Sequence, residues 1–210
     1  KTKLILAGAG ITKETSDKIK KNINKIHSFI QGEYAISLKN AIEGEPNEFY
    51  IGESLMDLKN FSYPYKNYKE AAYYFDPSMP TNKPQLQIYG SKGCPFRCTF
   101  CSWPQLMYNR KVVLRSADEI KGEIDHAMKF HNYKSIFFDD DTFNLDAQRV
   151  SKISTMLKEY KLPWTWMGRL DCSPDWLYDQ MIEDGCVGMR FGVETFALTP
   201  LKAIKKGLER

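Results

Sequence analysis

Three cysteines lie within eight residues of this chain, in the run Cys94-Pro-Phe-Arg-Cys98-Thr-Phe-Cys101. A four-iron iron–sulfur cluster normally takes one cysteine thiolate for each iron, and no fourth cysteine lies nearby. One iron would therefore lack a protein ligand, and an open coordination position is what allows a catalytic metal site to bind a small molecule. The spacing C-x-x-x-C-x-x-C thus predicts a 4Fe-4S cluster with one iron open to a ligand.

Two other interpretations of the cysteine triplet stay open. A structural zinc ion is usually closed by four ligands, and the histidines that follow the triplet, His126 and His131, lie well downstream in a predicted helix. A disulfide with a leftover thiol is the second possibility, although the chain has five cysteines and nothing in it indicates secretion. A zinc-stabilised binding module without catalysis is therefore the non-enzymatic alternative.

The bulk composition is that of an ordinary globular protein. Of 210 residues, 42% are hydrophobic and 27% are charged, and the net charge of +4 is too small to indicate a nucleic-acid partner. The sequence contains no apolar run long enough to span a membrane. An oxygen-sensitive cluster fits a reducing compartment, so the sequence favours the cytoplasm. The chain does not begin with methionine, which suggests a fragment or a processed chain.

The first 45 residues follow a strand–helix–strand–helix pattern. Strands are predicted over residues 3–10 and 27–31, and helices over residues 16–25 and 35–42. Such alternation favours parallel strands, but two units are too few for a complete doubly wound domain. Residues 1–45 are therefore predicted to be the back half of a Rossmann-like domain.

Residues 46–85 have a different composition, with five prolines among six tyrosines. The aromatic content is too high for a solvated coil, so this segment is predicted to be a linker that packs on its neighbours. Stacking of a tyrosine on a cofactor is the alternative.

From residue 86 onward, strands and helices alternate four times. Strands are predicted over residues 86–89, 135–138, 164–170 and 187–194. The sequence Ser116-Ala-Asp-Glu119 predicts a capping box, and a last helix is predicted from Thr199 to the end of the chain. The pattern predicts a parallel α/β array that is part of a (β/α) barrel, because a closed eight-stranded barrel needs about 250 residues.

Charged residues follow these strands at their carboxyl ends, where parallel α/β folds place their working residues. In chain order the ends carry the cysteine loop, Asp139–Asp141, Arg169–Asp171 and Glu194–Thr195. Four such ends in register favour a site for a polar, charged cofactor. On the last strand, Arg190 and Glu194 share a face with glycines, which predicts room for a ligand. An ion pair between Arg190 and Glu194 is the alternative.

Residues 86–210 resemble the radical S-adenosylmethionine (SAM) enzymes, and the run Gly93–Cys101 carries the resemblance. The resemblance implies a six-stranded partial barrel, of which roughly two strands would lie beyond this sequence. It implies a 4Fe-4S cluster held by Cys94, Cys98 and Cys101, with SAM bound to the open iron through its amino and carboxylate groups. It also implies that Phe100 lies beside the adenine of SAM.

Three further segments resemble the cobalamin-dependent branch of these enzymes. Many radical SAM enzymes carry Gly-Gly-Glu after the second strand, and this chain has Asp140-Asp141-Thr-Phe there. The runs Arg169-Leu-Asp and Gly192-Val-Glu194-Thr are also similar to that branch. The resemblance implies SAM contacts from side chains at the strand ends, namely Asp140, Asp141, Arg169, Arg190 and Glu194.

Residues 1–45 are similar to the last two strand–helix units of the cobalamin-binding domain in that branch. The resemblance implies cobalamin contacts at Gly8 and Gly10, where the first strand ends. The run Gly8-Ala-Gly10 lacks the third glycine of a dinucleotide fingerprint, and a plain tight turn is the alternative.

The implied reaction is reductive cleavage of SAM to a 5′-deoxyadenosyl radical, followed by cobalamin-dependent methylation of an unactivated carbon. A radical SAM methylthiotransferase or rearrangement without functional cobalamin is the alternative within the same class. The expected partners are a small-molecule or peptide substrate and an electron donor such as flavodoxin or ferredoxin. The single cysteines Cys172 and Cys186 are expected to be small core residues.

Overall fold

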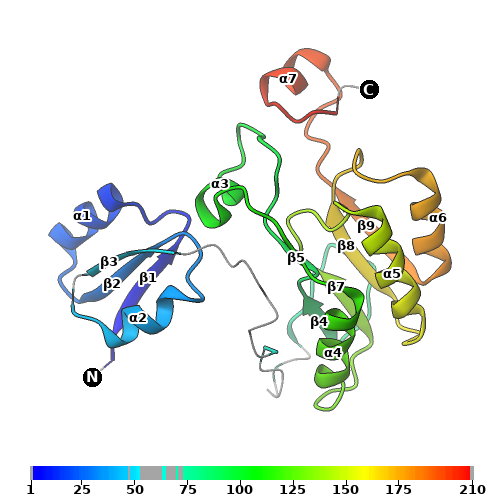
Figure 1. Ribbon diagram of the computed structural model, residues 1–210, viewed down its shortest axis with the longest axis horizontal. Helices are drawn as coiled ribbons and strands as arrows, with labels where there is room; N and C mark the ends of the chain where they lie inside the picture. Colours follow the sequence, from blue (N-terminus) through cyan, green and yellow to red (C-terminus); the bar gives the residue numbers. More distant parts are fainter. Residues whose placement is uncertain (1, 47, 53–62, 65–69, 71–72, 209–210) are drawn as a thin grey trace. The chain divides into compact units, whose positions relative to one another are not determined.

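The computed structural model of the chain describes residues 2–46, 48–52, 63–64, 70 and 73–208. The chain forms two compact units, each made of several stretches of sequence (Figure 1). Unit 1 comprises residues 1–57, 93–113 and 203–206, and unit 2 comprises residues 58–92, 114–202 and 207–210. Much of the predicted linker 46–85, from residue 53 to residue 72, lies outside the described residues apart from residues 63, 64 and 70.

The amino-terminal part of unit 1 is a three-stranded parallel sheet in the order β1-β2-β3, with two helices in the connections (Figure 1). Its elements are β1 (Leu4–Gly8), α1 (Lys13–Asn22), β2 (Ile26–Gln31), α2 (Ser37–Glu43) and β3 (Glu48–Ile51). The alternation of strands and helices in residues 1–45 therefore predicted the parallel arrangement correctly.

Two boundaries in this part differ from the prediction. Helix α1 begins at Lys13, before the predicted residue 16, because Thr12 and Thr15 form a capping box that satisfies the first backbone N–H groups. Strand β3 lies within the segment predicted to be a linker, and it pairs with β2 in register, Phe49 opposite Phe29. Strand β3 has only four residues, too few for a recognisable alternation of apolar and polar residues, and a proline lies close to it in the sequence.

Unit 2 is built on a four-stranded parallel sheet in the order β4-β7-β8-β9 (Figure 1). Its strands are β4 (Gln85–Ile88), β7 (Ser135–Phe138), β8 (Trp164–Gly168) and β9 (Cys186–Phe191). The connecting helices are α4 (Ala117–Ala127), α5 (Ala147–Lys158) and α6 (Asp175–Glu183). The four strands predicted after residue 86 are all present, and the described residues of this sheet form no closed barrel.

One face of this sheet carries the hydrophobic core of unit 2. Trp164 and Trp166 on β8 and Phe138 on β7 are fully buried and belong to one cluster with residues of α4, α5 and α6. The ring of Phe143, just after β7, lies 4.6 Å from that of Phe138 and 5.5 Å from that of Trp166. Full burial of a side chain such as phenylalanine contributes about 1.5–3 kcal/mol, so this face determines much of the stability of the unit.

The opposite face of the same sheet, the polar face, carries polar side chains beside the buried Phe137, and residues 76–82 pack against it. The Ser135 hydroxyl donates a hydrogen bond to the Asn82 carbonyl oxygen (2.6 Å), and the Gln85 side chain donates to the Thr81 hydroxyl (2.7 Å). Residues of one strand alternate between the two faces, so the polar residues neighbour the buried aromatic ones in sequence. The sheet thus separates a dry face from a polar face.

The remaining elements are β5 (Ser91–Lys92), α3 (Trp103–Tyr108), β6 (Val113–Leu114) and α7 (Leu198–Ala203). The prediction that the last helix continues to the chain end was wrong. Lys205 and Gly207 have φ angles of 52° and 80°, which a right-handed helix excludes.

The capping box at the start of α4 is confirmed, because the Glu119 N–H donates to the Ser116 hydroxyl (3.3 Å) and the Glu119 carboxylate accepts from the Ser116 N–H (2.7 Å).

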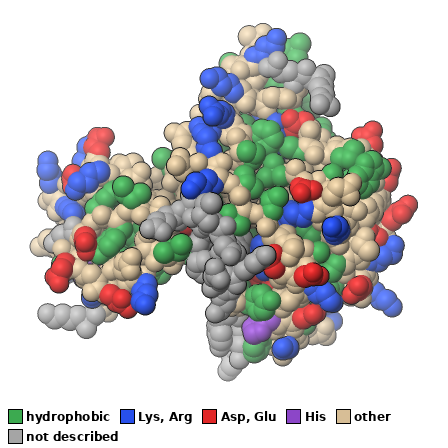
Figure 2. All heavy atoms as spheres, in the orientation of Figure 1, with side chains coloured by type: hydrophobic (Ala, Val, Ile, Leu, Met, Phe, Trp, Pro, Cys, Tyr) green, Lys and Arg blue, Asp and Glu red, His purple; other side chains and the backbone are tan. Residues whose placement is uncertain are grey.

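Charged side chains of both signs are interspersed over the face of unit 2 seen in Figure 2. This mixture agrees with the small net charge of the chain. Within the described part of the chain, every helix is too short or too polar to cross a lipid bilayer.

Candidate functional site

The three cysteines of the triplet lie on one loop of unit 1, which leads into α3. The N–H of Cys101 donates a hydrogen bond to the carbonyl oxygen of Cys98 (3.2 Å), so these two residues close one turn. Cys94 is buried, and Cys98 and Cys101 are half-buried. All five cysteines of the chain are thiols rather than disulfides, so the disulfide interpretation has no support.

Contacts within unit 1 hold the base of this loop. Gly93 has a φ of 86°, and a side chain at this position would overlap the carbonyl group of Lys111. After α3, Asn109 and Arg110 both adopt left-handed conformations, with φ of 48° and 58°, and the chain reverses. The Arg110 guanidinium then donates to the carbonyl oxygen of Phe96 (3.1 Å). These contacts fix both ends of the loop.

Helix α3 also contacts the carboxyl end of β2 in the same unit. The N–H of Glu33 donates to the carbonyl oxygen of Met107 (3.2 Å), and the buried Glu33 carboxylate accepts from the N–H groups of Tyr34 and Ala35 (3.0 Å each). Gly32 has a φ of 80°, and a Cβ there would lie 2.7 Å from the carbonyl oxygen of Leu106. The cysteine loop is therefore joined to the sheet of unit 1.

The predicted cobalamin contacts, Gly8 and Gly10, lie just where β1 ends. Gly8 has a φ of 119°, and its carbonyl oxygen accepts from the N–H groups of Ile11 (3.2 Å) and Gly32 (3.3 Å). The first of these bonds is the tight turn considered from the sequence. A Cβ on Gly8 or Gly10 would meet no atom within 4 Å, so the backbone there has open space beside it.

Side chains of the kinds that bind metals are scattered among the described residues. Among them, no group of three or more His, Cys, Asp or Glu side chains converges on a position for a metal ion. The fit of Cys94, Cys98 and Cys101 to an iron–sulfur cluster therefore rests on their thiol chemistry and on their place on one loop.

Asp140, a predicted SAM contact, is fully buried in unit 2 and is bonded to neighbouring residues. Its carboxylate accepts hydrogen bonds from the Gly90 N–H (2.9 Å) and from the Ser91 hydroxyl. Burial raises the pKa of Asp140 to about 6, against the lowering effect of these bonds and of the Arg149 charge. Arg149 donates to the carbonyl oxygens of Gly90 and Phe143. Asp140 thus fixes the residues that precede the cysteine loop.

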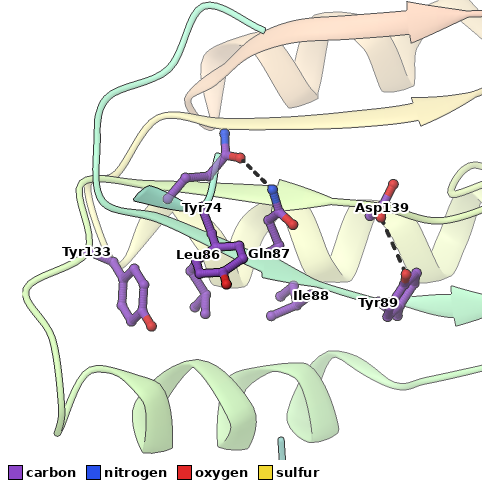
Figure 3. Close-up of a pocket in the computed structure, with 8 residues that line it drawn as sticks. Tyr74, Leu86, Gln87, Ile88, Tyr89, Tyr133 and Asp139 are labelled. Carbon is purple, nitrogen blue, oxygen red and sulfur yellow. Dashed lines mark hydrogen bonds between the residues drawn. The ribbon is translucent and has the colours of Figure 1, made fainter. Parts of the chain in front are cut away.

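A cavity of about 180 Å³ lies along β4 (Figure 3). Tyr74 and Tyr133 line one part of it, and Tyr89 and Asp139 line another. The Tyr89 hydroxyl donates to the Asp139 carboxylate (3.3 Å). Partial burial raises the pKa of Asp139 above its usual value, although the Tyr89 bond and the Arg190 charge oppose this. Burial and the Asp139 charge raise the pKa of Tyr89 to about 12.

Arg169 is only 4% exposed, and its guanidinium forms a two-bond ion pair with Asp171 (Nε–Oδ1 2.9 Å, Nη2–Oδ2 2.7 Å). Asn144 holds the same strand end in place. Its amide donates to the Arg169 carbonyl oxygen (2.7 Å) and to the Ser173 hydroxyl (2.9 Å), and it accepts from the Arg169 N–H (3.0 Å). Two parallel bonds to a carboxylate give Arg169 a fixed geometry, so it orders the end of β8.

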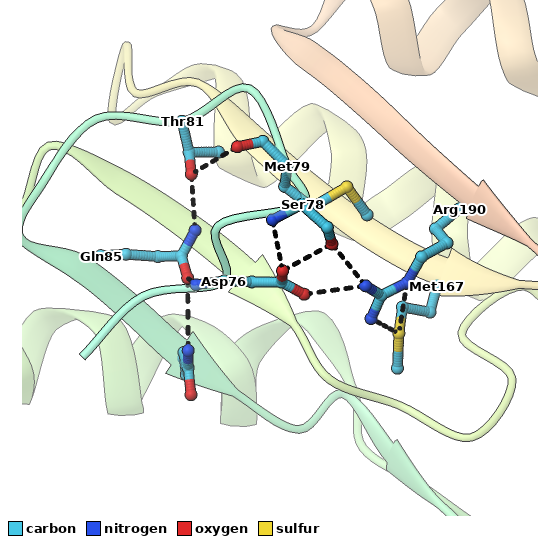
Figure 4. A network of polar contacts seen from close by, with 8 residues as sticks. Asp76, Ser78, Met79, Thr81, Gln85, Met167 and Arg190 are labelled. Atoms are coloured by element: carbon cyan, nitrogen blue, oxygen red, sulfur yellow. Dashed lines mark hydrogen bonds and ion pairs between the residues drawn. The ribbon is translucent and has the colours of Figure 1, made fainter.

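Arg190 pairs with Asp76 (Nη1–Oδ2 3.0 Å) and donates to the Ser78 hydroxyl (2.6 Å), as Figure 4 shows. The guanidinium also contacts the sulfur of Met167. Burial alone would raise the pKa of Asp76, but the Ser78 hydrogen bonds and the Arg190 charge bring it below its usual value. The sequence had suggested Glu194 as the ion-pair partner, and the structure assigns Asp76 to this role.

The room for a ligand predicted on the glycine face of β9 is filled at Gly188. A Cβ there would lie 3.0 Å from Pro80 and 3.1 Å from the Thr165 methyl group, so the prediction was wrong at this position. The glycine instead allows residues 76–82 to approach the strand.

On the other face, the register of β8 and β9 shifts between Trp164 and Thr165, and Val187 is left exposed.

Three other predicted SAM contacts lie after strands of unit 2 or on the cysteine loop of unit 1. Glu194 follows β9 with a φ of 66°, which is uncommon for a residue other than glycine. Asp141 is half-buried after β7, and its carbonyl oxygen accepts from the Thr142 hydroxyl (2.7 Å). Phe100, on the cysteine loop of unit 1, is 54% exposed. These positions stay predictions.

The sequence did not single out Ser91, Asn144, Arg149 or Asp76. Ser91 lies in the segment after β4 and Asn144 in the segment after β7, so a search of the polar residues in the segments that follow the strands would have found them. The contact of Asp76 with Arg190 and those of Arg149 with Gly90 and Arg115 carried no local signal, because these partners are distant in sequence.

None of the known protein-family models matches the chain. The chain is 32% identical over 123 residues to an uncharacterized methyltransferase of Pyrococcus horikoshii, which covers 58% of this chain and 27% of that protein. It is 27% identical over 125 residues to cytidylyl-2-hydroxyethylphosphonate methyltransferase of Streptomyces wedmorensis, covering 57% of this chain and 23% of the relative.

A third relative is the hopanoid C-2 methylase of Rhodopseudomonas palustris, with 28% identity over 127 residues, 57% of this chain and 24% of the relative. The chain therefore spans about a quarter of the length of these curated relatives. Each of them is named as a methyltransferase or a methylase, so this chain is similar to enzymes that transfer methyl groups.

Proposed function

We propose that this chain is part of a radical SAM methyltransferase that cleaves S-adenosylmethionine at a 4Fe-4S cluster and methylates an unactivated carbon with the help of cobalamin. The cysteine triplet carries the proposal, because three thiols lie within eight residues on one loop, and Cys98 and Cys101 share a turn. The methyltransferase relatives support methyl transfer as the outcome. An electron donor such as flavodoxin or ferredoxin and a small-molecule or peptide substrate complete the proposal.

Cys94, Cys98 and Cys101 would hold the cluster, and their thiol chemistry fits this role. A cluster held there would supply the one electron that reductive cleavage of SAM to methionine and a 5′-deoxyadenosyl radical requires. The chain itself orients the thiols, through the close contact of Gly93 with Lys111 and the Arg110 hydrogen bond at the loop base.

The polar residues of unit 2 divide into two groups in this proposal. Asp140 and Arg169 are buried and paired, so they fix the strand ends. Asp139 and Tyr89 line a cavity and present a carboxylate and a hydroxyl that can bind a polar group such as the SAM ammonium. Asp141, Arg190 and Glu194 remain proposed SAM contacts in unit 2, and Arg190 would share its guanidinium with Asp76. Phe100 remains a proposed SAM contact in unit 1.

The second part of the proposal is that unit 1 binds cobalamin at the carboxyl ends of its strands. The open space beside Gly8 and Gly10 supports this, because a large ligand could approach the backbone there. Corrinoid that stays with the purified protein, detected by its visible absorption, is the expected result. A protein that neither retains nor binds added cobalamin would instead favour a methylthiotransferase or a rearrangement.

The decisive experiment is low-temperature EPR of the anaerobically reconstituted and reduced chain, with and without SAM. We expect about four irons per chain and a cubane signal that changes when SAM is added. Single Cys→Ala variants at positions 94, 98 and 101 should lose the signal. Cys172→Ala is the matched control, because it removes a thiol outside the triplet, and it should keep the signal.

Three other outcomes would contradict the proposal. Zinc without iron or sulfide would select the non-catalytic binding module. A cubane signal indifferent to SAM would indicate an electron-transfer cluster. If the wild type and the Cys98→Ala variant gave equal EPR signals, the cluster would be held by other ligands.

A further inference from the structure

The cavity along β4 follows the whole length of the strand (Figure 3). It is lined by Gln85–Tyr89 and by Tyr74, Tyr133 and Asp139, all of which belong to unit 2. At about 3.3 Å per residue, the stretch from Gln85 to Tyr89 spans about 13 Å. A volume of about 180 Å³ along that length makes the cavity a narrow channel. Its shape suits an unbranched chain better than a broad ring system.

The two ends of this channel differ in chemistry. Tyr133, which is only 2% exposed, lies at the end where β4 begins, and Tyr89 and Asp139 lie at the end where the strand finishes (Figure 3). Between these ends, the apolar side chains of Leu86 and Ile88 line the cavity. Apolar walls with a few polar groups at one end fit a ligand that has an apolar body and a polar head.

The Asp139 carboxylate retains the capacity to accept further hydrogen bonds. In the described part of the chain, its side-chain oxygens accept one bond, from the Tyr89 hydroxyl, and at 3.3 Å that bond is long. By contrast, Asp76 pairs with Arg190 at 3.0 Å, and Asp140 accepts bonds from a backbone N–H and a hydroxyl. A carboxylate has about four lone-pair sites, so Asp139 can receive a donor from a ligand.

The charges around this end of the cavity favour a cation. Partial burial raises the pKa of Asp139, and a bound cation would offset that cost of burying a negative charge. The nearby Arg190 shares its charge with Asp76. The Lys92 ammonium lies 5.6 Å from the centre of the Tyr89 ring, so Tyr89 offers its hydroxyl rather than its ring to a ligand.

The same end of the cavity disfavours a ligand carboxylate. The described residues that line the cavity are tyrosines, glutamines, leucine, isoleucine and one aspartate, and none of them carries a positive charge. An amino acid, whose carboxylate adjoins its ammonium, would bring a negative charge close to Asp139. An amine without a neighbouring carboxylate avoids this repulsion.

We propose that the cavity along β4 binds a protonated primary amine on an unbranched aliphatic chain, with the ammonium at Asp139 and Tyr89 and the chain along Leu86 and Ile88. A free alkylamine and the side chain of a lysine in a peptide share this chemistry. The inference goes beyond the proposed function, because neither a cluster nor cobalamin enters it. The SAM ammonium is the competing occupant of this end, and the test separates the two.

The test is an NMR titration of the chain with hexylamine and with hexanol, followed through the backbone amide signals of β4. We expect hexylamine to shift the signals of Gln87 and Tyr89 saturably. Hexanol has the same chain without the charge and should bind about tenfold more weakly.

Three variants locate the ammonium. D139N should weaken hexylamine binding about tenfold, and Y89F, which removes the hydroxyl, about fivefold. D179N is the matched control, because it removes an exposed carboxylate on α6 of the same unit, and it should leave the affinity unchanged. Melting temperatures show whether each variant folds, and Y89F decides the outcome if D139N does not.

The inference is overturned if hexylamine and hexanol bind equally, if D139N binds hexylamine as the wild type does, or if neither probe shifts the β4 signals. Each of these outcomes leaves the EPR test of the proposed function unaffected. Displacement of hexylamine by SAM would also overturn the inference, and it would favour the proposed function. An acetylated and amidated glycyl-lysyl-glycine peptide distinguishes the two sources of the amine. Tighter binding of the peptide than of hexylamine supports a lysine side chain, and weaker binding supports a free amine.

Discussion

The two faces of the unit 2 sheet differ in what holds them together. The face toward α4, α5 and α6 is packed with aromatic and aliphatic side chains such as Trp164 and Phe138, which are fully buried. The other face is held by hydrogen bonds and by the Asp76–Arg190 ion pair. Neighbouring residues of one strand belong to different faces. Stability and polar chemistry are therefore assigned to alternate residues of the same strands.

Replacing a tryptophan of the dry face should have the largest effect on stability. Trp164→Ala should lower the free energy of unfolding by about 3–5 kcal/mol, because it leaves a large cavity and removes a hydrogen bond to the Asp184 carbonyl oxygen. Trp176→Ala is the matched control, since Trp176 is 45% exposed on α6. Denaturant titration measures the free energy of unfolding of both variants. Similar losses would contradict the distinction between a buried and an exposed tryptophan.

Asp140 should dominate the pH dependence at the carboxyl end of the sheet. Its pKa is raised from 3.8 to about 6, so the folded state binds the proton more tightly than the unfolded state. This contribution to stability is present below about pH 4 and is lost as the pH rises through about 6. At about 1.4 kcal/mol for each pKa unit, it amounts to roughly 2–3 kcal/mol.

The variant Asp140→Asn removes this titration. We therefore expect the stability of Asp140→Asn relative to the wild type to increase by roughly 2–3 kcal/mol between pH 4 and pH 7.5. Denaturant titrations at several pH values measure the difference. A difference that does not change with pH would show that the carboxyl group titrates alike in both states.

Asn144 should have an intermediate effect, because it joins the segment after β7 to the end of β8 through three hydrogen bonds. Asn144→Ala leaves the buried N–H and carbonyl groups of Arg169 without these partners and should cost about 1–3 kcal/mol. Asn144→Asp keeps the acceptor oxygen, removes the two amide donor bonds and adds a buried charge. A loss below about 0.5 kcal/mol for Asn144→Ala would mean that water replaces the amide.

The ion pair of the polar face should have the smallest effect. The Arg190 side chain is 42% exposed, so its pairing with Asp76 should contribute only about 0.2–1 kcal/mol. A double-mutant cycle of Asp76→Asn and Arg190→Gln measures this coupling. A coupling of several kcal/mol would contradict the view that the polar face adds little to stability.

The fold could be predicted from the sequence where its signals are local. Hydrophobic alternation and the Ser116 capping box identified the strands and the start of α4, because these depend on residues a few positions apart. The partners of Asp140 and Arg190 could not be predicted in the same way. Asp140 bonds with Gly90 and Ser91, and Arg190 with Asp76 and Ser78, across large separations in sequence.

The resemblance assigned Asp140, Arg169 and Arg190 to a cofactor, and the structure gives each a protein partner, which is local in sequence only for Arg169. A strand pattern indicates which face a side chain occupies, but not which distant segment covers that face. The segment 76–82 has no periodicity, so its position against the polar face could come only from the tertiary structure. The end of α7 was missed for a related reason, because a left-handed lysine is not visible in a sequence pattern.

The closed base of the cysteine loop has a consequence for the order of events during synthesis. The three thiols and the contacts of Gly93 with Lys111 lie within a short stretch of chain, so this loop has low contact order and a small closure entropy. At about 5–20 residues per second, β9 is completed roughly 5–20 s after Cys101. The three thiols and the base of their loop are therefore synthesised before the unit 2 sheet can form.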